Sequence, residues 1–357
     1  MTTDSRPALF VTGHAPSDRI GAFKLLAERE NVRFALFGGR IHHGASEPAV
    51  LDFDHLRLSQ TEVARASSSG EYRAVICGTS GRVALPGAYF GARRAGVPFI
   101  LWASLWAQPK GPAGIAGALP LRWIYRHCDA VVSYGKHVSS YVRSCGAEIV
   151  FEAPQAVDNA FWATPADPVL ERRAPFQAVF VGRLVREKGI DVLVAAWGRS
   201  QEDSAHSALI VVGEGPQGDR VSDTPGIAAV GQLTAEKVRG LFASSDVLVL
   251  PSIATLTFKE PWGLVVNEAM NQALPVIVTD AVGAAAGGLV RDGVNGLIVP
   301  AGDSHALAAA INRLRDDRAL ANKLGAQGRL DVASYTYGAW ADGFTAALVA
   351  ARTSRVG

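Results

Sequence analysis

Two acidic residues eight positions apart, Glu260 and Glu268, have the type and spacing that most clearly suggest chemistry in this chain. They flank a Pro-Trp-Gly step, and the apolar run 247–250 before them reads as a strand. The proline, the glycine and the apolar residues 264–266 predict that a helix begins near Pro261, which places Glu268 about two turns inside it. A helix start attracts phosphate, and carboxylates accept hydrogen bonds from the paired hydroxyls of sugars. The spacing alone fits two solvated acids at an ordinary helix start equally well.

Two cations follow another predicted strand. Arg183 comes directly after the strand expected at 177–182, and Lys188 lies five residues further along. An arginine fork and a lysine ammonium can together bind the two phosphates of a nucleoside diphosphate. They would also stabilise the charge that grows on this leaving group as the anomeric bond breaks. As isolated residues, such cations more often lie on the surface without a ligand.

Together these segments resemble the signature of retaining glycosyltransferase family 4. In that family two glutamates separated by seven residues bracket a Phe-Gly or Trp-Gly step, and a strand and its loop carry an Arg and a Lys. The resemblance is dense from about residue 175 to 315 and thin before 150. Its segments are Phe180–Leu184 with Glu187–Gly189, Val211–Pro216, Glu260–Glu268, and Pro275–Asp280 with Asp292–Pro300.

The resemblance implies a role for each matched residue. Arg183, Lys188 and Glu260 would be the catalytic residues, the two cations on the diphosphate and the acid on hydroxyls of the transferred sugar. Glu268 would hold the ribose hydroxyls. The other residues expected to bind the donor are Gly13, Gly182, Gly213, Gly215, Gly231, Leu233, Trp262, Gly263 and Leu264.

The sequence departs from the family pattern in three places. Relatives often carry a histidine in the first domain that holds the donor sugar, whereas residues 102–104 read Trp-Ala-Ser. The residue of the first domain that would hold the donor sugar is therefore unassigned. The family's Asn-Gly-Val-Asp is Gln-Ala-Val-Asp at 155–158, and the glycine-rich turn 282–288 lacks the usual Pro-Glu.

No metal cofactor is expected. The chain has no Asp-x-Asp at a predicted strand end and no His/Cys cluster, so Arg183 and Lys188 would neutralise the diphosphate. The resemblance implies retention of anomeric configuration. No protein nucleophile is evident, which fits attack on the same face as the leaving group, with the leaving phosphate helping to deprotonate the acceptor.

Parallel sheets are expected to position these residues. Short apolar runs alternate with helical patterns, which predicts two α/β, doubly wound Rossmann-like domains in the glycosyltransferase-B arrangement, with ligands at the cleft between the carboxyl ends of the sheets. The first set of predicted strands is 8–11, 32–37, 74–77, 99–102, 130–133 and 148–152, with helices such as 20–30 and 83–95 between them. The second set is 177–182, 207–212, 227–230, 246–250, 275–278 and 297–299.

The same alternation sets the expected domains. An N-terminal acceptor-binding domain is predicted over 1–165 and a nucleotide-sugar-binding domain over 166–336. The proline- and charge-rich residues 162–176 read as their connection. In the last segment, 337–357, a helix at about 337–351 is expected to cross back to the first domain, as in relatives.

Composition narrows the class of protein. A chain of 357 residues is long enough for two domains with separate cores, and a net charge of +2 gives no reason to expect a nucleic acid partner. Cys77, Cys128 and Cys145 are scattered and odd in number, which indicates reduced, mostly buried thiols. We find no signal peptide and no apolar run of the ~18 residues that a membrane span needs. The expected location is the cytoplasm, with peripheral contact at the inner face of the membrane left open.

The sequence therefore predicts a retaining, metal-independent glycosyltransferase that moves a hexose from a nucleoside diphosphate sugar to a hydroxyl acceptor, in bacterial polysaccharide, glycolipid or natural-product biosynthesis. A nucleotide-sugar 2-epimerase of the same fold and a non-enzymatic sugar-nucleotide-binding protein stay open as alternatives. A dehydrogenase would need Gly-x-Gly-x-x-Gly after a strand, and residues 213–216 lack the third glycine. A lipid-linked acceptor could meet the aromatic and basic residues 122–126, although an ordinary amphipathic helix explains them more simply.

Overall fold

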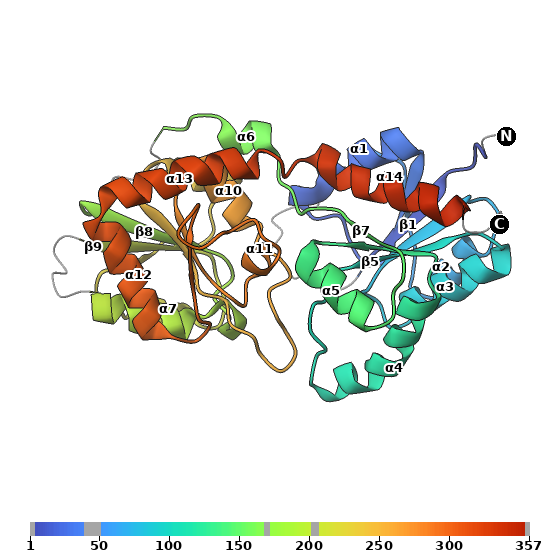
Figure 1. The fold of residues 1–357 in the computed structure, drawn as a ribbon, viewed down its shortest axis with the longest axis horizontal. Coiled ribbons are helices and arrows are strands. Elements are labelled where there is room, and N and C mark those ends of the chain that lie inside the picture. Colours follow the sequence, from blue (N-terminus) through green and yellow to red (C-terminus); the bar gives the residue numbers. More distant parts are fainter. Residues whose placement is uncertain (1–3, 39–50, 168–171, 201–206, 354–357) are drawn as a thin grey trace. The chain divides into compact units, whose positions relative to one another are not determined.

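The chain divides into two compact units in the computed structural model, which describes residues 4–38, 51–167, 172–200 and 207–353 (Figure 1). The first unit is Met1–Ala156 with Thr336–Gly357, and the second is Val157–Tyr335. The first boundary therefore falls after Ala156, against the expected position after residue 165.

The first unit is built on a seven-stranded parallel sheet with the order β3-β2-β1-β4-β5-β6-β7. Its strands are β1 (Ala8–Thr12), β2 (Val32–Leu36), β3 (His55–Arg57), β4 (Ala74–Gly78), β5 (Phe99–Ala103), β6 (Ala130–Ser133) and β7 (Val150–Glu152). The chain builds one side of the sheet from β1 to β3 and the other from β4 onward. The order thus reverses between β1 and β4, which is where doubly wound sheets bind ligands.

Helices cover both faces of this sheet. They are η1 (Ser17–Arg19), α1 (Ile20–Glu30), α2 (Glu62–Ser67), α3 (Ala84–Ala95), α4 (Pro112–His127), α5 (Lys136–Ser144) and α14 (Tyr337–Thr353). Successive residues of β1 point to opposite faces, so Leu9 and Val11 belong to one hydrophobic cluster and Ala8 and Phe10 to the other. Burial on both faces explains why the strands read as continuous apolar runs.

The last helix, α14, completes one of these two clusters. It packs against α1 and against strands β5, β6 and β7 (Figure 1). Trp340 and Phe344 of α14 are buried beside Phe10 and Phe23. The first unit therefore depends on the end of the chain for part of its core.

The second unit repeats the same topology in a six-stranded parallel sheet with the order β10-β9-β8-β11-β12-β13. Its strands are β8 (Phe176–Val181), β9 (Ser207–Val212), β10 (Ile227–Ala229), β11 (Val247–Leu250), β12 (Val276–Thr279) and β13 (Leu297–Val299). Its helices are α6 (Asn159–Ala163), η2 (Arg186–Lys188), α7 (Ile190–Ser200), α8 (Gly218–Ser222), α9 (Ala235–Ala243), α10 (Val265–Asn271), α11 (Gly283–Ala286), α12 (Ser304–Asp316) and α13 (Arg318–Val332). Here the order reverses between β8 and β11.

The predicted fold class, with two doubly wound Rossmann-like sheets, is confirmed. One strand, β3, was missed because it has three partly exposed residues at the edge of its sheet and no apolar run.

The aspartate of the Gln-Ala-Val-Asp segment, Asp158, has a structural function, since its side chain accepts a hydrogen bond from Phe161 N at 3.0 Å and caps α6. No helix in the described ranges is long and apolar enough to cross a bilayer.

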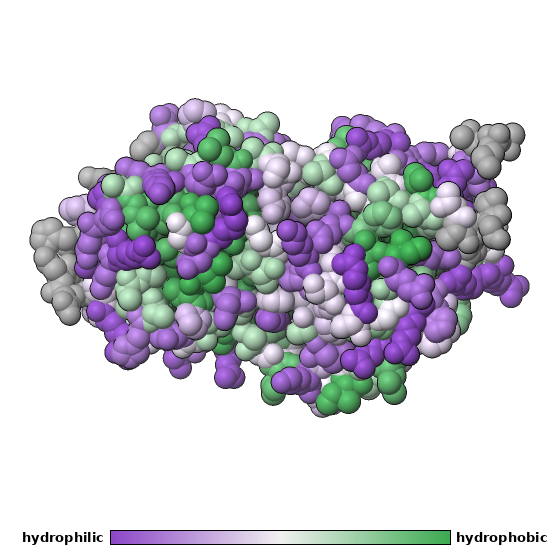
Figure 2. Space-filling view, in the orientation of Figure 1, coloured by the Kyte–Doolittle hydropathy of each residue, from purple (hydrophilic) through white to green (hydrophobic). Residues whose placement is uncertain are grey.

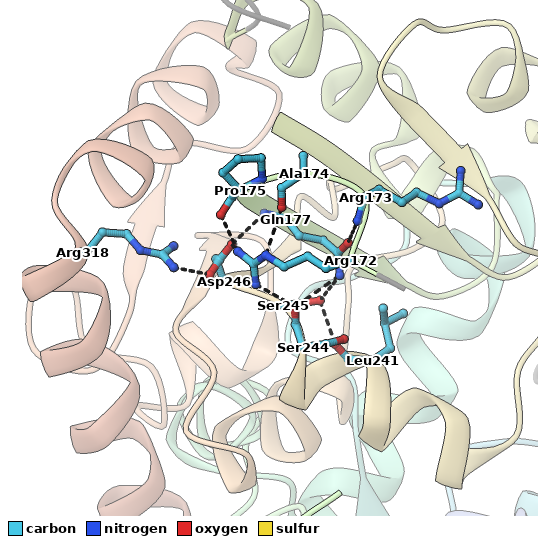
Figure 3. Close-up of polar contacts among 10 residues, drawn as sticks. All are labelled: Arg172, Arg173, Ala174, Pro175, Gln177, Leu241, Ser244, Ser245, Asp246 and Arg318. Carbon is cyan, nitrogen blue, oxygen red and sulfur yellow. Dashed lines mark hydrogen bonds and ion pairs between the residues drawn. The ribbon is translucent and has the colours of Figure 1, made fainter. Parts of the chain in front are cut away.

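A polar cluster ties β8 to β11 at the amino-terminal edge of the second sheet (Figure 3). The Asp246 carboxylate accepts a hydrogen bond from Gln177 N at 2.7 Å and forms ion pairs with Arg172 and Arg318. Arg172 also donates to three nearby backbone carbonyls. This cluster lies at the opposite end of β8 from Arg183 and Lys188, so its function is structural.

Candidate active site

The loops after β8, β9 and β11 are joined at the carboxyl edge of the second sheet. Leu184 N donates to Glu214 O at 2.9 Å, and Ile253 N donates to Glu187 O at 3.0 Å. The loop after β8 is thus hydrogen-bonded to the other two, at the point where the strand order reverses. A crevice outside the carboxyl ends of the strands at such a reversal is where open α/β sheets bind ligands.

Lys188 and Glu260 meet at this edge. Lys188 ends the η2 turn, and its Nζ donates to Glu260 Oε2 at 2.5 Å. The two side chains are only 14% and 9% exposed, and Ser252 Oγ donates to the same carboxylate oxygen at 3.2 Å. Two of the three residues predicted to be catalytic therefore form a largely buried ion pair, which sequence reasoning did not anticipate.

The turn after β12 holds the Glu260 backbone in place. Glu260 forms a β-bridge with Val282, and its carbonyl accepts a hydrogen bond from Gly283 N at 3.1 Å. A Cβ atom at Gly283 would lie 2.0 Å from Pro261 O, so this close approach requires glycine. The glycine-rich turn that departs from the family pattern thus positions the acid that precedes the Trp-Gly step.

Arg183, the third predicted catalytic residue, lies on the same loop as Lys188. Its guanidinium is 3.7 Å from the Glu187 carboxylate, and the two side chains are 33% and 26% exposed. Partly exposed ion pairs of this kind contribute little to stability. Arg183 can therefore exchange Glu187 for a phosphate group at small cost.

Glu268 lies in the first turn of α10, whereas we expected it about two turns inside a helix starting near Pro261. The helix begins only at Val265, and Glu268 is half-buried. Trp262 is a core residue, 3% exposed, and its indole Nε1 donates to Asn267 Oδ1 at 2.8 Å. The Trp262 side chain therefore serves packing, while its backbone begins the turn through Gly263 and Leu264 into the helix.

The predicted donor-binding glycines of the second unit lie in adjacent loops. Gly213 N donates to Gly231 O at 2.8 Å, and a Cβ atom at Gly213 would lie 2.0 Å from Gly182 O. Loop packing alone therefore requires glycine at position 213. Gly215 follows in the same loop, and half-buried Leu233 lies two residues beyond Gly231.

Sequence reasoning missed a second lysine at this edge. Lys259 immediately precedes Glu260, and burial lowers the pKa of its ammonium group, with the charge of Asp280 acting in the opposite direction. Its position next to a matched glutamate was the available signal. Lys259 adds positive charge where the loops after β11 and β12 approach each other.

In the first unit, Gly13 follows β1 at the reversal of strand order. His137, which sequence analysis did not select, lies in the first turn of α5 after β6, and its ring is 4.9 Å from the ring of Trp106 after β5. No local pattern marks His137, because only the parallel pairing of β5 and β6 brings it to the carboxyl edge.

Among the residues that the structure describes, no group of three or more His, Cys, Asp or Glu side chains is arranged to hold a metal ion.

Comparison with known proteins gives the same family as the motifs. A family model described as "Glycosyl transferases group 1" matches residues 175–317. Glycogen synthase from Mycobacterium tuberculosis is 28% identical over 211 residues, which cover 56% of this chain and 49% of that protein. A GDP-mannose-dependent alpha-mannosyltransferase from Corynebacterium glutamicum is 33% identical over 208 residues, which cover 55% and 47%. The chain thus spans about half the length of these curated relatives.

Solved structures extend the likeness in fold to nearly the whole chain. The crystal structure of Anabaena Alr3699/HepE in complex with UDP has a TM-score of 0.76 at 16% identity, and the match covers 96% of this chain and 99% of that one. The range matched by the family model contains Arg183, Lys188, Glu260 and Glu268. Residues 175–317 are thus similar to the group 1 glycosyltransferases in motifs and in sequence, and the two doubly wound sheets have the glycosyltransferase-B fold.

Proposed function

We propose that this chain is a retaining, metal-independent glycosyltransferase that moves a hexose from a nucleoside diphosphate sugar to a hydroxyl group of an acceptor. The bond between the anomeric carbon and the diphosphate oxygen breaks, and its electron pair stays on the diphosphate. The acceptor oxygen forms the new bond on the same face of the sugar, and the acceptor proton passes to the leaving diphosphate.

The observation that carries this proposal is the contact between Lys188 and Glu260. In a nucleoside diphosphate sugar one oxygen atom joins the distal phosphorus to the anomeric carbon. A cation on that phosphate and a carboxylate on the sugar hydroxyls must therefore lie within a few ångströms of each other. Lys188 and Glu260 meet this requirement, at the edge of the sheet where such folds bind ligands.

Each of the charged residues binds a different part of the donor. Arg183 and Lys188 bind the diphosphate and stabilise the negative charge that develops on it, so their contacts strengthen toward the transition state. Glu260 accepts hydrogen bonds from hydroxyls of the transferred sugar, and Glu268 accepts them from the ribose. These cations take the place that a divalent metal ion occupies in other transferases.

Backbone groups complete the proposed donor site. Trp262 to Leu264 cap the distal phosphate, residues 213–216 pass beneath the nucleoside, and residues 231–233 border the base. The connected loops support this assignment, since Gly213 and Gly231 are hydrogen-bonded to each other. Gly13 is the backbone contact that we propose from the first unit.

Donor binding and transfer can be tested in sequence. The full chain is first screened by thermal shift against UDP-glucose, GDP-mannose and the free nucleoside diphosphates, because a ligand at about 100 times its Kd stabilises by about 2.7 kcal/mol. The donor that binds is then incubated with candidate polysaccharide, glycolipid and small-molecule acceptors. We expect acceptor-dependent release of nucleoside diphosphate and a product whose anomeric configuration, read by NMR, matches that of the donor.

Two outcomes would contradict the proposal. If no nucleotide sugar stabilised the chain in the thermal-shift screen, the proposed donor site would be wrong. Conversion of the donor to an isomeric sugar without any acceptor would identify a 2-epimerase instead.

A further inference from the structure

One stretch of the first unit carries positive charge and no acidic residue. Between Glu71 and Asp129 the sequence contains no Asp or Glu, although the chain as a whole has nearly equal numbers of acidic and basic residues. The same stretch contains seven basic residues, namely Arg73, Arg82, Arg93, Arg94, Lys110, Arg122 and Arg126. It includes α3, α4 and the loop between β5 and α4.

Helix α4 presents a row of exposed apolar side chains. Ile115, Leu119 and Trp123 are spaced four residues apart and so share one face of the helix. They are 64%, 77% and 43% exposed. Phe90 of α3 is 60% exposed, and its ring stacks on that of Trp123 with centroids 6.0 Å apart. Phe90, Ile115, Leu119 and Trp123 are called the α3–α4 patch below.

The fold of the first unit leaves this patch uncovered. In α4 the buried residues are Ile124 and Tyr125, both near its carboxyl end, so the first turns of the helix contribute little to the core. Figure 2 shows hydrophobic atoms gathered at the lower edge of the molecule, over the position of α4 in Figure 1. A contiguous apolar surface on a folded chain marks an interaction site.

Exposed cations lie on the two helices of the patch and on the segments just before them. They are Arg82, Arg94, Lys110, Arg122 and Arg126. A shallow hollow of about 580 Å³ beside Phe90 has Val83 and Pro86 in its lining, together with the arginines Arg65 and Arg94. Apolar walls with guanidinium groups at the rim match the chemistry of an anionic lipid, whose phosphate lies next to its acyl chains.

We propose that the α3–α4 patch docks this chain on a membrane surface that contains anionic lipids. The apolar side chains enter the boundary between headgroups and acyl chains, Trp123 lies at the level of the headgroups, and the exposed cations bind lipid phosphates. The contact is peripheral, since no described helix could span the bilayer. A second copy of the chain is a poor occupant, because it would bring the same exposed cations of α3 and α4 against one another.

Flotation with lipid vesicles tests this proposal. The full chain is mixed with vesicles of phosphatidylcholine alone or of phosphatidylcholine and phosphatidylglycerol, without nucleotide or acceptor. We expect binding to the mixed vesicles, weaker binding at high salt, and little binding to neutral vesicles. Leu119→Glu should lower the partition coefficient about tenfold or more, because an apolar contact is lost and a negative charge gained. Arg122→Ala should lower it about fivefold.

Matched controls come from α13 of the second unit. Leu330 is 71% exposed, close to the value for Leu119, and the neighbouring Arg329 is also exposed. Leu330→Glu and Arg329→Ala should bind the mixed vesicles like the unmodified chain. Circular dichroism of each variant shows that the fold is retained.

Three results would overturn the proposal. The first is failure of the unmodified chain to float with anionic vesicles, and the second is an equal loss of binding in Leu330→Glu. The third is a dimer in solution that Leu119→Glu dissociates while vesicles bind neither form, which would make the patch a self-association surface. Because the assay contains no donor or acceptor, its outcome is independent of the proposed transferase activity.

Discussion

The ion pair between Lys188 and Glu260 can be tested by a double-mutant cycle of Lys188→Met and Glu260→Gln. Methionine keeps most of the length of the lysine side chain without its charge, and glutamine keeps the shape of the glutamate. The cycle therefore separates the interaction between the two charges from the packing of each side chain. Lys323→Met, at an exposed position of α13, is the matched control for removing a lysine charge.

The expected magnitude follows from burial and geometry. Removing one member of a buried ion pair costs about 3–5 kcal/mol, because the remaining charge is desolvated and unpaired. Here the side chains are 14% and 9% exposed, so water partly solvates the charge that remains. Ser252 also donates a hydrogen bond to Glu260, which lowers the cost of leaving its carboxylate without Lys188. We expect about 2–3 kcal/mol of destabilisation for Lys188→Met, or about 4–12 °C in Tm for a unit of this size. The double variant should be more stable than additivity predicts by about 2 kcal/mol.

Two assays are applied to the four proteins of the double-mutant cycle. Urea denaturation without ligand measures the coupling in the free protein, and steady-state release of nucleoside diphosphate measures turnover. Lys188→Met should lower turnover by about 10²-fold or more, the scale for loss of a contact to a charged transition state, while Lys323→Met should change neither quantity. Destabilisations that add within about 0.5 kcal/mol would show that the two charges do not interact in the free protein. Near-normal turnover in folded Lys188→Met would refute the leaving-group assignment.

Three further predictions concern the donor site and its support. Activity should persist in excess EDTA, measured as nucleoside diphosphate release, and a loss that Mn²⁺ restores would contradict metal independence. Calorimetric affinity for the free nucleoside diphosphate should fall about tenfold or more in Glu268→Ala and hardly change in Glu260→Ala. The free diphosphate keeps the ribose proposed for Glu268 but lacks the transferred sugar proposed for Glu260; the reverse order would exchange their roles. Burial acts to raise the pKa of Asp331, but hydrogen bonds led by that from Arg291 outweigh it, so the net pKa is lowered. The Asp331 carboxylate therefore stabilises the fold above its unfolded pKa of about 3.9 and loses this effect as pH falls through the folded value. Urea denaturation of Asp331→Asn should show a deficit at neutral pH that disappears in acid, and a deficit independent of pH would argue against this.

Strand positions were predictable because each central strand is buried on both faces. Val247–Leu250 and Ser207–Val212 are buried throughout and read as apolar runs between polar turns. The start of α10 was predicted four residues too early, near Pro261. The bridge from Glu260 to Val282 holds that segment against the neighbouring turn, and Gly263 has a φ of 92°, so the helix cannot begin before these residues.

The sequence by itself determined the fold class and the residue types of the candidate site, because periodicity and motif spacing are local properties. Only the tertiary structure decided that Lys188 contacts Glu260. They are 72 positions apart, and they meet because the strand order places β8 beside β11. The same holds for α4, whose apolar spacing reads in the sequence like that of a helix facing the core. Whether neighbouring elements cover that face depends on packing, and in this fold Ile115, Leu119 and Trp123 remain exposed.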